Sequence, residues 1–279
     1  MVKVKDSHMR SEVNPQSQRA FPDIEFKMPV LFVGHGSPTN AIEDNIFTQA
    51  WVKMAASLPQ PKAILCVSAH WETVGTEVTA TDQPETIHDF FGFPDELYQV
   101  KYPAPGSPSL AHLVRETVHL SEIRLNHARG LDHGTWSVLC KMFPKADIPV
   151  IQLSLDSSRE PAFHNALGRE LRSLRRKGVL IVGSGNIVHN LRSIVWQDTA
   201  YDWALAFDER IRDLILAGDH QSLIDYQSLG PQARLAAPTN EHYLPLLYVL
   251  GLQDPEDEIA FYADQVTLGS ISMRSIKIG

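Results

Sequence analysis

Histidines stand directly after separate apolar runs of this 279-residue chain. His35 follows VLFVG, His70 follows ILCVSA, and His189 lies just beyond VLIVGSGN. Ligands of doubly wound sheets bind outside the carboxyl ends of the parallel strands, so we predict that these imidazoles meet at one edge of a sheet. Imidazole is a common ligand for iron, zinc and copper. The pattern therefore predicts a metal site, which His242, in TNEHYLPL, could also reach.

The other histidines carry weaker signals. His133 in LDHGTW and His88 in TIHDF each adjoin an aspartate, which would satisfy the ring of a structural loop histidine as readily as that of a catalytic one. Glu241 could supply a carboxylate ligand, but it also fits the favourable acidic residue in the first turn of a helix. The histidines predicted to be solvated, or for His8 to lie in an N-terminal tail, are His112, His119, His127, His164, His220 and His8.

Two other kinds of site compete with a metal centre. Ser37 lies two residues from His35 in GHGSP, but the G-x-S-x-G nucleophile elbow is missing, so we predict that Ser37 caps the following segment. The GSGN segment lacks the G-x-G-x-x-G spacing of a dinucleotide site, and the sequence has no P-loop lysine motif. Gly183 and Gly185 are instead predicted to allow a tight turn or a close approach of backbone beneath the site.

Apolar runs and helical stripes supply the elements that must position these side chains. Residues 28–34, 63–69 and 179–183 are apolar runs typical of parallel strands that are buried on both faces. Between the first two, apolar residues recur at helical spacing over 46–58, which predicts a βαβ unit. Further helical or amphipathic segments are predicted at 109–120, 160–177, 201–217 and 242–250, and further strands at 149–155 and in the C-terminal runs EIAFYA and ISMRSIKI.

These elements predict an α/β fold. We expect a single domain over residues 28–279, with a central, mostly parallel sheet flanked by helices and antiparallel strands at the C-terminal edge, after a flexible tail over residues 1–27. One irregular stretch, residues 82–108, exceeds the usual length of a loop, and its aromatic content argues against disorder. We predict that it forms a pocket. Its aromatic residues able to stack on a flat ring are Phe90, Phe91, Phe93 and Tyr98.

Composition excludes several classes of partner. The 33 acidic and 25 basic side chains give a net charge of -8, which disfavours nucleic acid and an anionic membrane. Two cysteines cannot build a disulfide framework. The first 27 residues lack the apolar region of a signal peptide, and no window approaches the roughly 18 apolar residues of a membrane-spanning helix. We predict a cytoplasmic monomer or small homo-oligomer.

Several separated motifs, in order along the chain, carry a family resemblance. They are GHGSP, SAHW, TIHDFFGFP, YPAPGSP, LDHGTW, GSGNIVHNL and EHYLPLLYVLG. From Met28 to Gly279 the chain resembles the class III extradiol ring-cleavage dioxygenases, and within them the DOPA 4,5-dioxygenase-like branch. The resemblance implies a mononuclear non-haem iron(II) enzyme that binds a catechol through both oxygens and cleaves the ring next to the diol. Its partners would be a small aromatic diol, such as DOPA, and O2, both atoms of which enter the product.

The resemblance also implies a ligand set. His35, His70 and His242 match the positions of the metal-binding residues. In relatives that cleave protocatechuate the third ligand is a glutamate, so Glu241 stays an alternative, and we choose His242 because the DOPA-type branch carries histidine there. We expect one Fe(II) per chain for activity, although Zn(II) can occupy such nitrogen sites in a purified sample.

Further roles follow from the same resemblance. His189 matches the histidine that acts as acid and base, and it lies close enough to be a fourth ligand in the resting form. His133 matches a second pocket histidine that contacts substrate or oxygen. The residues predicted to bind substrate are His88, Phe91 and Tyr98. The same imidazoles keep two alternatives open, a zinc-dependent hydrolase and a non-catalytic metal-binding protein whose closed site has no open position.

Overall fold

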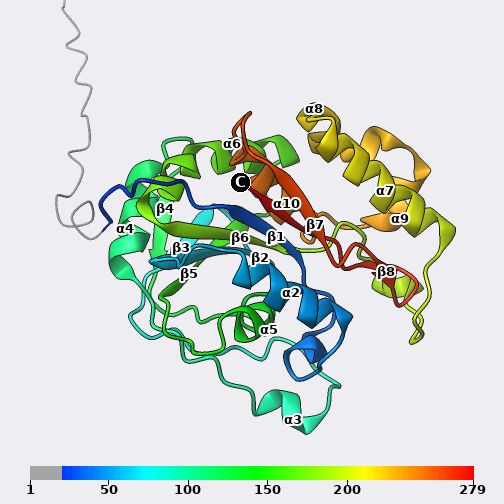
Figure 1. The fold of residues 1–279 in the computed structure, drawn as a ribbon, viewed down its shortest axis with the longest axis horizontal. Coiled ribbons are helices and arrows are strands. Elements are labelled where there is room, and N and C mark those ends of the chain that lie inside the picture. The colour runs from blue at the N-terminus through cyan, green and yellow to red at the C-terminus, as the bar shows by residue number, and fades with distance from the viewer. Residues whose placement is uncertain (1–20) are drawn as a thin grey trace, which may run out of the picture.

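An eight-stranded sheet forms the centre of the computed structural model, which describes residues 21–279 (Figure 1). In spatial order the strands are β4 (Ile123–Asn126), β3 (Thr76–Thr79), β5 (Val150–Asp156), β2 (Ala63–Thr73), β6 (Val179–Gly185), β1 (Val30–Gly34), β10 (Ser275–Ile278) and β7 (Ile259–Tyr262). Strands β5, β2, β6 and β1 run parallel to one another. Strand β10 pairs antiparallel with β1, and β7 pairs antiparallel with β10. The predicted fold class is therefore confirmed.

The central strands are apolar throughout because both of their faces are covered. Along β1, Val30 and Phe32 belong to one hydrophobic core, while Leu31 and Val33 belong to the other. Successive side chains of a strand point to opposite faces, so a strand between two helical layers needs apolar residues at every position.

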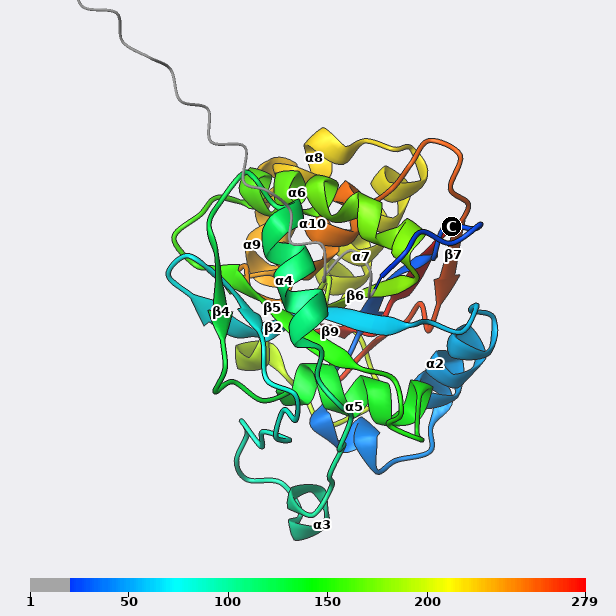
Figure 2. The ribbon, with the colours of Figure 1, turned by 90° about the vertical axis from the view of Figure 1, so that its left-hand side faces the viewer.

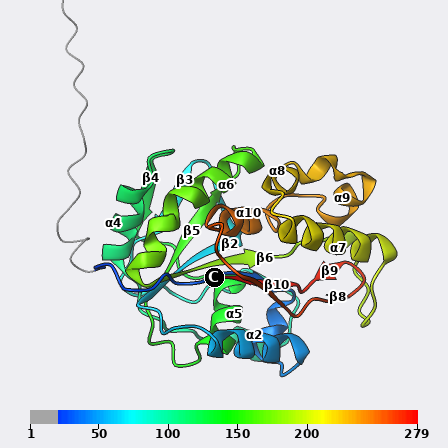
Figure 3. The same ribbon diagram turned by 45° about the horizontal axis from the view of Figure 1, so that its top comes forward.

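Helices cover both faces of the sheet (Figure 2). One face carries α4 (Pro108–Thr117), α6 (Pro161–Glu170), η2 (Leu171–Lys177) and α10 (Leu244–Gly251). The opposite face carries η1 (Pro38–Ala41), α2 (Ile46–Ala56), α3 (Asp95–Tyr98) and α5 (His133–Met142). The group beyond α10 comprises α7 (Asp202–Leu216), α8 (His220–Ile224), η4 (Tyr226–Leu229) and α9 (Pro231–Ala236). Figure 3 shows α7 above a small ribbon of β8 (Val266–Thr267) and β9 (Ile271–Ser272).

Two details differ from the sequence prediction, and a third agrees with it. The predicted helix over 160–177 is an α-helix that tightens into the 3-10 helix η2, which ends at Gly178 in the left-handed conformation. Strands β3 and β4 extend the sheet at the edge opposite β7 and were not predicted, since four residues give too short a pattern to recognise. The stretch 82–108 holds only the short helix α3 and the first residue of α4, and is otherwise irregular, as expected.

The start of the described chain packs against the domain. Residues 1–20 of the predicted tail lie outside the described residues. Phe21 is buried in the core, so contacts with the domain begin before residue 28. The fully buried guanidinium of Arg175 donates to the carbonyl of Met28 at 2.8 Å and to the carboxylate of Asp257 at 2.6 Å, which ties this segment to the C-terminal region.

Within residues 21–279, no helix is both long enough and apolar enough to cross a membrane. The boundary between tail and domain at residue 27 and the cytoplasmic location stay predictions.

Candidate metal centre

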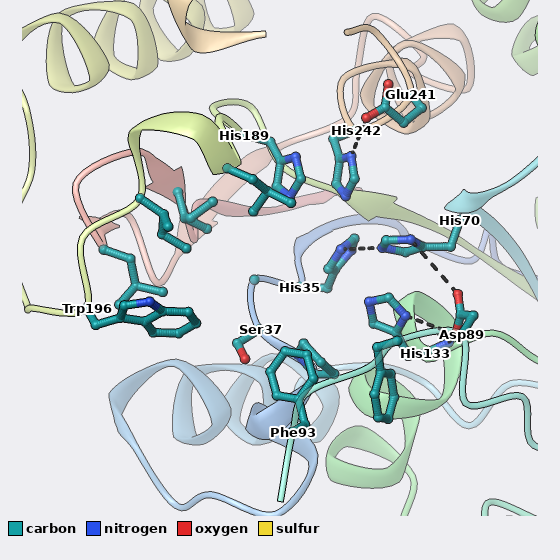
Figure 4. Close-up of a pocket in the computed structure, with 17 residues that line it drawn as sticks. His35, Ser37, His70, Asp89, Phe93, His133, His189, Trp196, Glu241 and His242 are labelled. Atoms are coloured by element: carbon teal, nitrogen blue, oxygen red, sulfur yellow. Dashed lines mark hydrogen bonds and ion pairs between the residues drawn. The ribbon is translucent and has the colours of Figure 1, made fainter. Parts of the chain in front are cut away.

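A cavity of about 320 Å³ opens at the carboxyl ends of β1, β2 and β6 (Figure 4). Its volume lies at the lower end of the range of small-molecule sites. The polar residues that line it are His35, Ser37, His70, Asp89, His133, His189, Glu241 and His242. Imidazoles from distant parts of the sequence thus gather at the predicted edge of the sheet.

His35 follows β1 directly, and Ser184 at the end of β6 sets its orientation. The hydroxyl of Ser184 donates its proton to the carbonyl of Gly134, so it accepts from Nδ1 of His35 at 3.0 Å. A proton on Nδ1 leaves the lone pair of Nε2 free for a metal. Asn40 donates to the carbonyl of His35 at 3.0 Å and holds the turn after the strand.

His70 lies inside β2, whereas the sequence predicted that the strand ends one residue earlier. The pairing of β2 with β5 shifts register between Val67 and Glu72, so the strand continues past an irregularity that contains the histidine. Nε2 of His70 lies 3.1 Å from Nε2 of His35. Gly134 permits this packing, because a Cβ there would lie 2.9 Å from Cδ2 of His70.

His242 stands just before α10 and is held against the end of β6. The backbone N–H of Asn186 donates to the carbonyl of His242 at 2.8 Å, and a Cβ on Gly185 would lie 2.1 Å from the same oxygen. The predicted close approach at this glycine is therefore confirmed. Nε2 of His242 is buried and has no hydrogen-bond partner among residues 21–279.

Glu241 orients the ring of His242. Its Oε1 accepts from Nδ1 of His242 at 3.0 Å and from the hydroxyl of Thr239 at 2.9 Å. Figure 4 shows Glu241 on the far side of His242 from His35 and His70. One carboxylate oxygen still lies within 4.8 Å of ring nitrogens of His189 and His242, so the geometry alone leaves Glu241 within reach of an ion bound there.

Two members of the predicted ligand set, His35 and His70, have the spacing that a divalent metal needs. The ring centroids of His35, His70 and His242 are separated by 4.9 to 5.3 Å. Two nitrogens bound at 2.0–2.1 Å to one ion, about 95° apart, would be about 3.1 Å from each other. The Nε2 atoms of His35 and His70 are separated by that distance. An ion would also satisfy the orphaned Nε2 of His242.

His133, the first residue of α5, lies beside this set. Its ring centroid is 3.8 Å from that of His70, and its ligand atom lies within 4.8 Å of those of His35 and His70, so it competes for the third position. Nδ1 of His133 donates to Oδ1 of Asp89 at 3.0 Å, and its backbone N–H donates to the same oxygen at 2.9 Å. The adjacent Asp132 instead caps the N-terminus of α5.

The pKa of Asp89 falls to about 2. Burial opposes this change, but it is outweighed by the hydrogen bonds from His133 and by the charge on that imidazole. The carboxylate therefore stays ionised at neutral pH and keeps its hold on the ring.

His189 stacks on His242, with ring centroids 3.4 Å apart and planes at 10°. Its backbone N–H donates to the carbonyl of Ala236 at 2.7 Å, which fixes the segment beyond β6. The stack places a further imidazole beside the candidate ligands.

Burial keeps the candidate ligands neutral. Desolvation, and then charge on neighbouring imidazoles, lowers the pKa of His70 and of His189 to about 3. The same causes hold the pKa of His35 and of His242 well below the usual value. Neutral imidazoles present lone pairs to a metal without first losing a proton.

The pocket-forming role predicted for residues 82–108 is confirmed, and two of the four predicted aromatic residues perform it. Phe90 and Phe93 line the cavity. Phe91 is 91% exposed, while His88 and Tyr98 lie behind Phe90 at ring distances of 5.8 and 5.1 Å. The structure thus corrects the predicted substrate contacts, because His88, Phe91 and Tyr98 do not line the cavity. An irregular loop has no fixed period from which the inward side chains could be predicted.

Other sequence predictions are tested as well. Ser37 caps η1 by accepting from the amide of Thr39, as predicted. His164 was predicted to be solvated, but it is fully buried against the hydroxyl of Tyr248, and burial lowers its pKa to about 4. His8 lies outside the described residues. Trp196, a wall of the cavity that is 72% exposed, was missed, since its flanking loop has no periodic pattern.

Comparison with known proteins places the chain in a family. Residues 29–271 match the model of the catalytic LigB subunit of aromatic ring-opening dioxygenase. The chain therefore belongs to this family of aromatic ring-opening dioxygenases.

Individual relatives narrow the comparison to one branch. A 4,5-DOPA dioxygenase extradiol of Escherichia coli (strain K12) is 48% identical over 259 residues, which cover 91% of this chain and 95% of the relative. That of Beta vulgaris is 40% identical over 229 residues, covering 79% and 85%. The crystal structure of an uncharacterized protein from Escherichia coli K12 has a TM-score of 0.78 and 42% identity, covering 91% of this chain and all of the other. The predicted DOPA 4,5-dioxygenase-like resemblance is confirmed.

Proposed function

We propose that this protein is a metal-dependent extradiol dioxygenase that uses O2 to open a catechol, by 4,5-cleavage of DOPA or of a related substituted catechol. The observation that carries the proposal is the convergence of His35, His70 and His242 on one cavity, with two more histidines beside them. Relatives named 4,5-DOPA dioxygenase extradiol support the substrate class.

In this proposal His35, His70 and His242 hold one Fe(II). Bound Fe(II) would acidify a coordinated phenol and keep positions open for the diol and for O2. We choose His242 over Glu241 because Oε1 of Glu241 already accepts from that ring, and over His133 because Nε2 of His242 is buried without a hydrogen-bond partner among the described residues.

His189 is the proposed acid and base. Because its imidazole is neutral before substrate binds, it can accept a proton from a catechol hydroxyl. The negative charge of the bound catecholate favours the protonated ring, which can later return the proton to a developing oxyanion. Its stack on His242 brings it to the ligand set, so a fourth-ligand role in the resting form is part of the proposal.

His133 is the proposed contact to the substrate oxygens. Asp89 engages Nδ1 and leaves Nε2 to the cavity (Figure 4). The rings of Phe90 and Phe93 supply an apolar wall on which a catechol can stack, and they exclude water from the reacting atoms.

Anaerobic reconstitution with Fe(II), followed by oxygen uptake and the appearance of a yellow ring-opened product from DOPA, tests the function. If no member of a panel of catechols is turned over and a zinc-loaded form hydrolyses esters or amides, the protein is instead a zinc-dependent hydrolase. Metal that binds without either activity would indicate a non-catalytic metal-binding protein.

The ligand set needs a separate measurement. We expect His242→Ala to lose most bound metal, whereas His133→Ala and His189→Ala retain metal but lose ring cleavage. His112→Ala, which changes a half-buried histidine outside the cavity, is the matched control; its metal content should equal that of the parent. If His133→Ala loses metal and His242→Ala retains it, His133 is the third metal ligand and His242 is the contact to the substrate.

A further inference from the structure

A second cavity adjoins the one that holds the histidines. It has a volume of about 240 Å³ and shares four wall residues with the first cavity. The shared residues are Ser37, Trp196, Leu268 and Ile271. Because these side chains line both spaces, the two cavities adjoin each other there.

The second cavity has mixed walls, and their polar side chains offer an acceptor for a cation. The side chains of Asn40, Glu43 and Asn45 line it, and the carboxylate of Glu43 accepts from Nδ2 of Asn45 at 3.0 Å. This hydrogen bond limits the positions that the exposed carboxylate can take. Thr267, a further wall residue, donates to the carboxylate of Asp198 at 3.1 Å, which adds negative charge nearby.

Aromatic side chains lie where the two cavities adjoin. Trp196 is 72% exposed although it lines both spaces, and Figure 4 shows its indole and the ring of Phe93 on either side of Ser37. An indole face attracts an ammonium group through the ring quadrupole. Aliphatic linkers also pack well on such a surface.

The walls carry no compensating positive side chain. Of the described residues that line either cavity, none is Lys or Arg, whereas three are acidic: Asp89, Glu241 and Glu43. Arg192 follows the wall residue Leu191 in sequence but is exposed and lines neither cavity. A substrate carboxylate would therefore lose hydration and meet like charge without an ion-pair partner.

We propose that the second cavity selects catechols whose side chain ends in a cationic amine and rejects those whose side chain ends in a carboxylate, with Glu43 and Trp196 as the specificity-determining residues. This inference rests on the proposed catechol-cleaving function, which fixes the diol in the first cavity. DOPA carries both groups, so its ammonium is favoured there and its carboxylate is not.

Four catechols with related side chains test the proposal in the Fe(II)-reconstituted enzyme. Dopamine carries the amine alone, 3-(3,4-dihydroxyphenyl)propionate the carboxylate alone, L-DOPA both groups, and 4-ethylcatechol neither. We expect kcat/KM to fall in the order dopamine, 4-ethylcatechol, propionate, with L-DOPA below dopamine. Added salt should narrow the spread, because it screens the exposed carboxylate of Glu43.

Variants identify the residues responsible. Glu43→Gln should lower kcat/KM for dopamine by about 2- to 5-fold, the range of an exposed ion pair, and leave 4-ethylcatechol unchanged. Trp196→Leu should lower kcat/KM for dopamine by a similar factor, and it should lower kcat/KM for 4-ethylcatechol less. The matched control is Asp44→Asn, which removes the same charge from the neighbouring exposed residue outside both cavities. It should leave kcat/KM unchanged for all four substrates.

The outcomes separate the inference from the function beneath it. No turnover of 4-ethylcatechol or of any other member of the set would defeat the proposed function. Turnover of 4-ethylcatechol, with the propionate cleaved as efficiently as dopamine, would overturn the inference alone. Equal effects of Glu43→Gln and Asp44→Asn on kcat/KM would also overturn it, because Glu43 would then act only through the overall charge of the protein.

Discussion

The hydrogen bonds from His133 to Asp89 predict a defined effect of the substitution Asp89→Asn. The carboxylate accepts both the backbone N–H and the Nδ1–H of His133, and its side chain is 21% exposed. Asparagine has nearly the same shape and keeps one acceptor oxygen, so the change removes the charge while leaving the volume of the site intact. The variant therefore isolates the electrostatic part of the contact.

The magnitude follows from the pKa of Asp89. That pKa falls from 3.8 to about 2, a difference worth about 2 kcal/mol of native-state stability at pH 7. Since asparagine still accepts one hydrogen bond, we expect Asp89→Asn to lower the free energy of unfolding by about 1 to 2 kcal/mol. Urea denaturation of the metal-free protein measures this without a contribution from metal binding.

The pH dependence has a definite sign. The native-state pKa lies below the unfolded-state value, so the stabilisation by Asp89 is complete above about pH 4 and is lost as the pH falls towards 2. The difference in stability between the parent and Asp89→Asn should therefore shrink over that interval. A difference that grows on acidification would refute the argument.

The same substitution should affect catalysis more than substrate binding. Loss of the group that orients His133 is expected to lower kcat about 10- to 100-fold, by analogy with residues that orient metal ligands, with little change in KM. Asp95→Asn, at the exposed first residue of α3, is the control for loss of a carboxylate and should leave kcat unchanged. An unchanged kcat in Asp89→Asn would show that the orientation of His133 does not limit the reaction.

Three further substitutions test other parts of the structure. Gly185→Ala places a Cβ 2.1 Å from the carbonyl of His242, so we expect a loss of about 1 to 3 kcal/mol in urea denaturation and weaker metal binding by titration; parent-like values would contradict the close approach. Phe93→Ala should raise the KM for catechols about 2- to 10-fold, whereas Phe91→Ala should leave the KM unchanged. Equal effects of the two substitutions on the KM would show that Phe93 does not form a wall of the substrate cavity. Asp257→Asn removes the shorter ion pair of the fully buried guanidinium of Arg175, at 2.6 Å, and leaves the longer one to Asp254, at 3.8 Å. It should cost about 3 to 5 kcal/mol, measured by the urea midpoint, and a loss below about 1 kcal/mol would contradict this.

The sequence predicted well those features that depend on short segments. The apolar runs at the cores of β1, β2 and β6 could be recognised because strands buried on both faces need no polar side chains. His35 and His189 could be placed at one edge because parallel strands end together. Gly185 could be assigned to a close approach because only glycine lacks the Cβ that would block it.

Features that depend on the path of irregular chain could not be predicted. His133 adjoins Asp132 in sequence, yet its ring is held by Asp89, 44 residues away. Phe90 and Phe91 are neighbours of the same chemistry, but one faces the cavity and the other faces solvent. Neither choice follows from a pattern, because loop conformation is set by contacts that form only when distant segments meet.

The sequence by itself determined the α/β fold, the edge of the sheet at which the imidazoles gather, and the family to which the chain belongs. The fold and the edge follow from hydrophobic periodicity and from side chains at strand ends, whereas the family follows from the resemblance of several ordered motifs; each of these features is local. The tertiary structure alone decided which partner fixes each ring, which aromatic residues form the wall, and that a second cavity with Glu43 and Trp196 adjoins the first. The physical reason is that orientation, burial and the charge around a cavity arise from long-range packing, and the order of residues along one segment does not specify them.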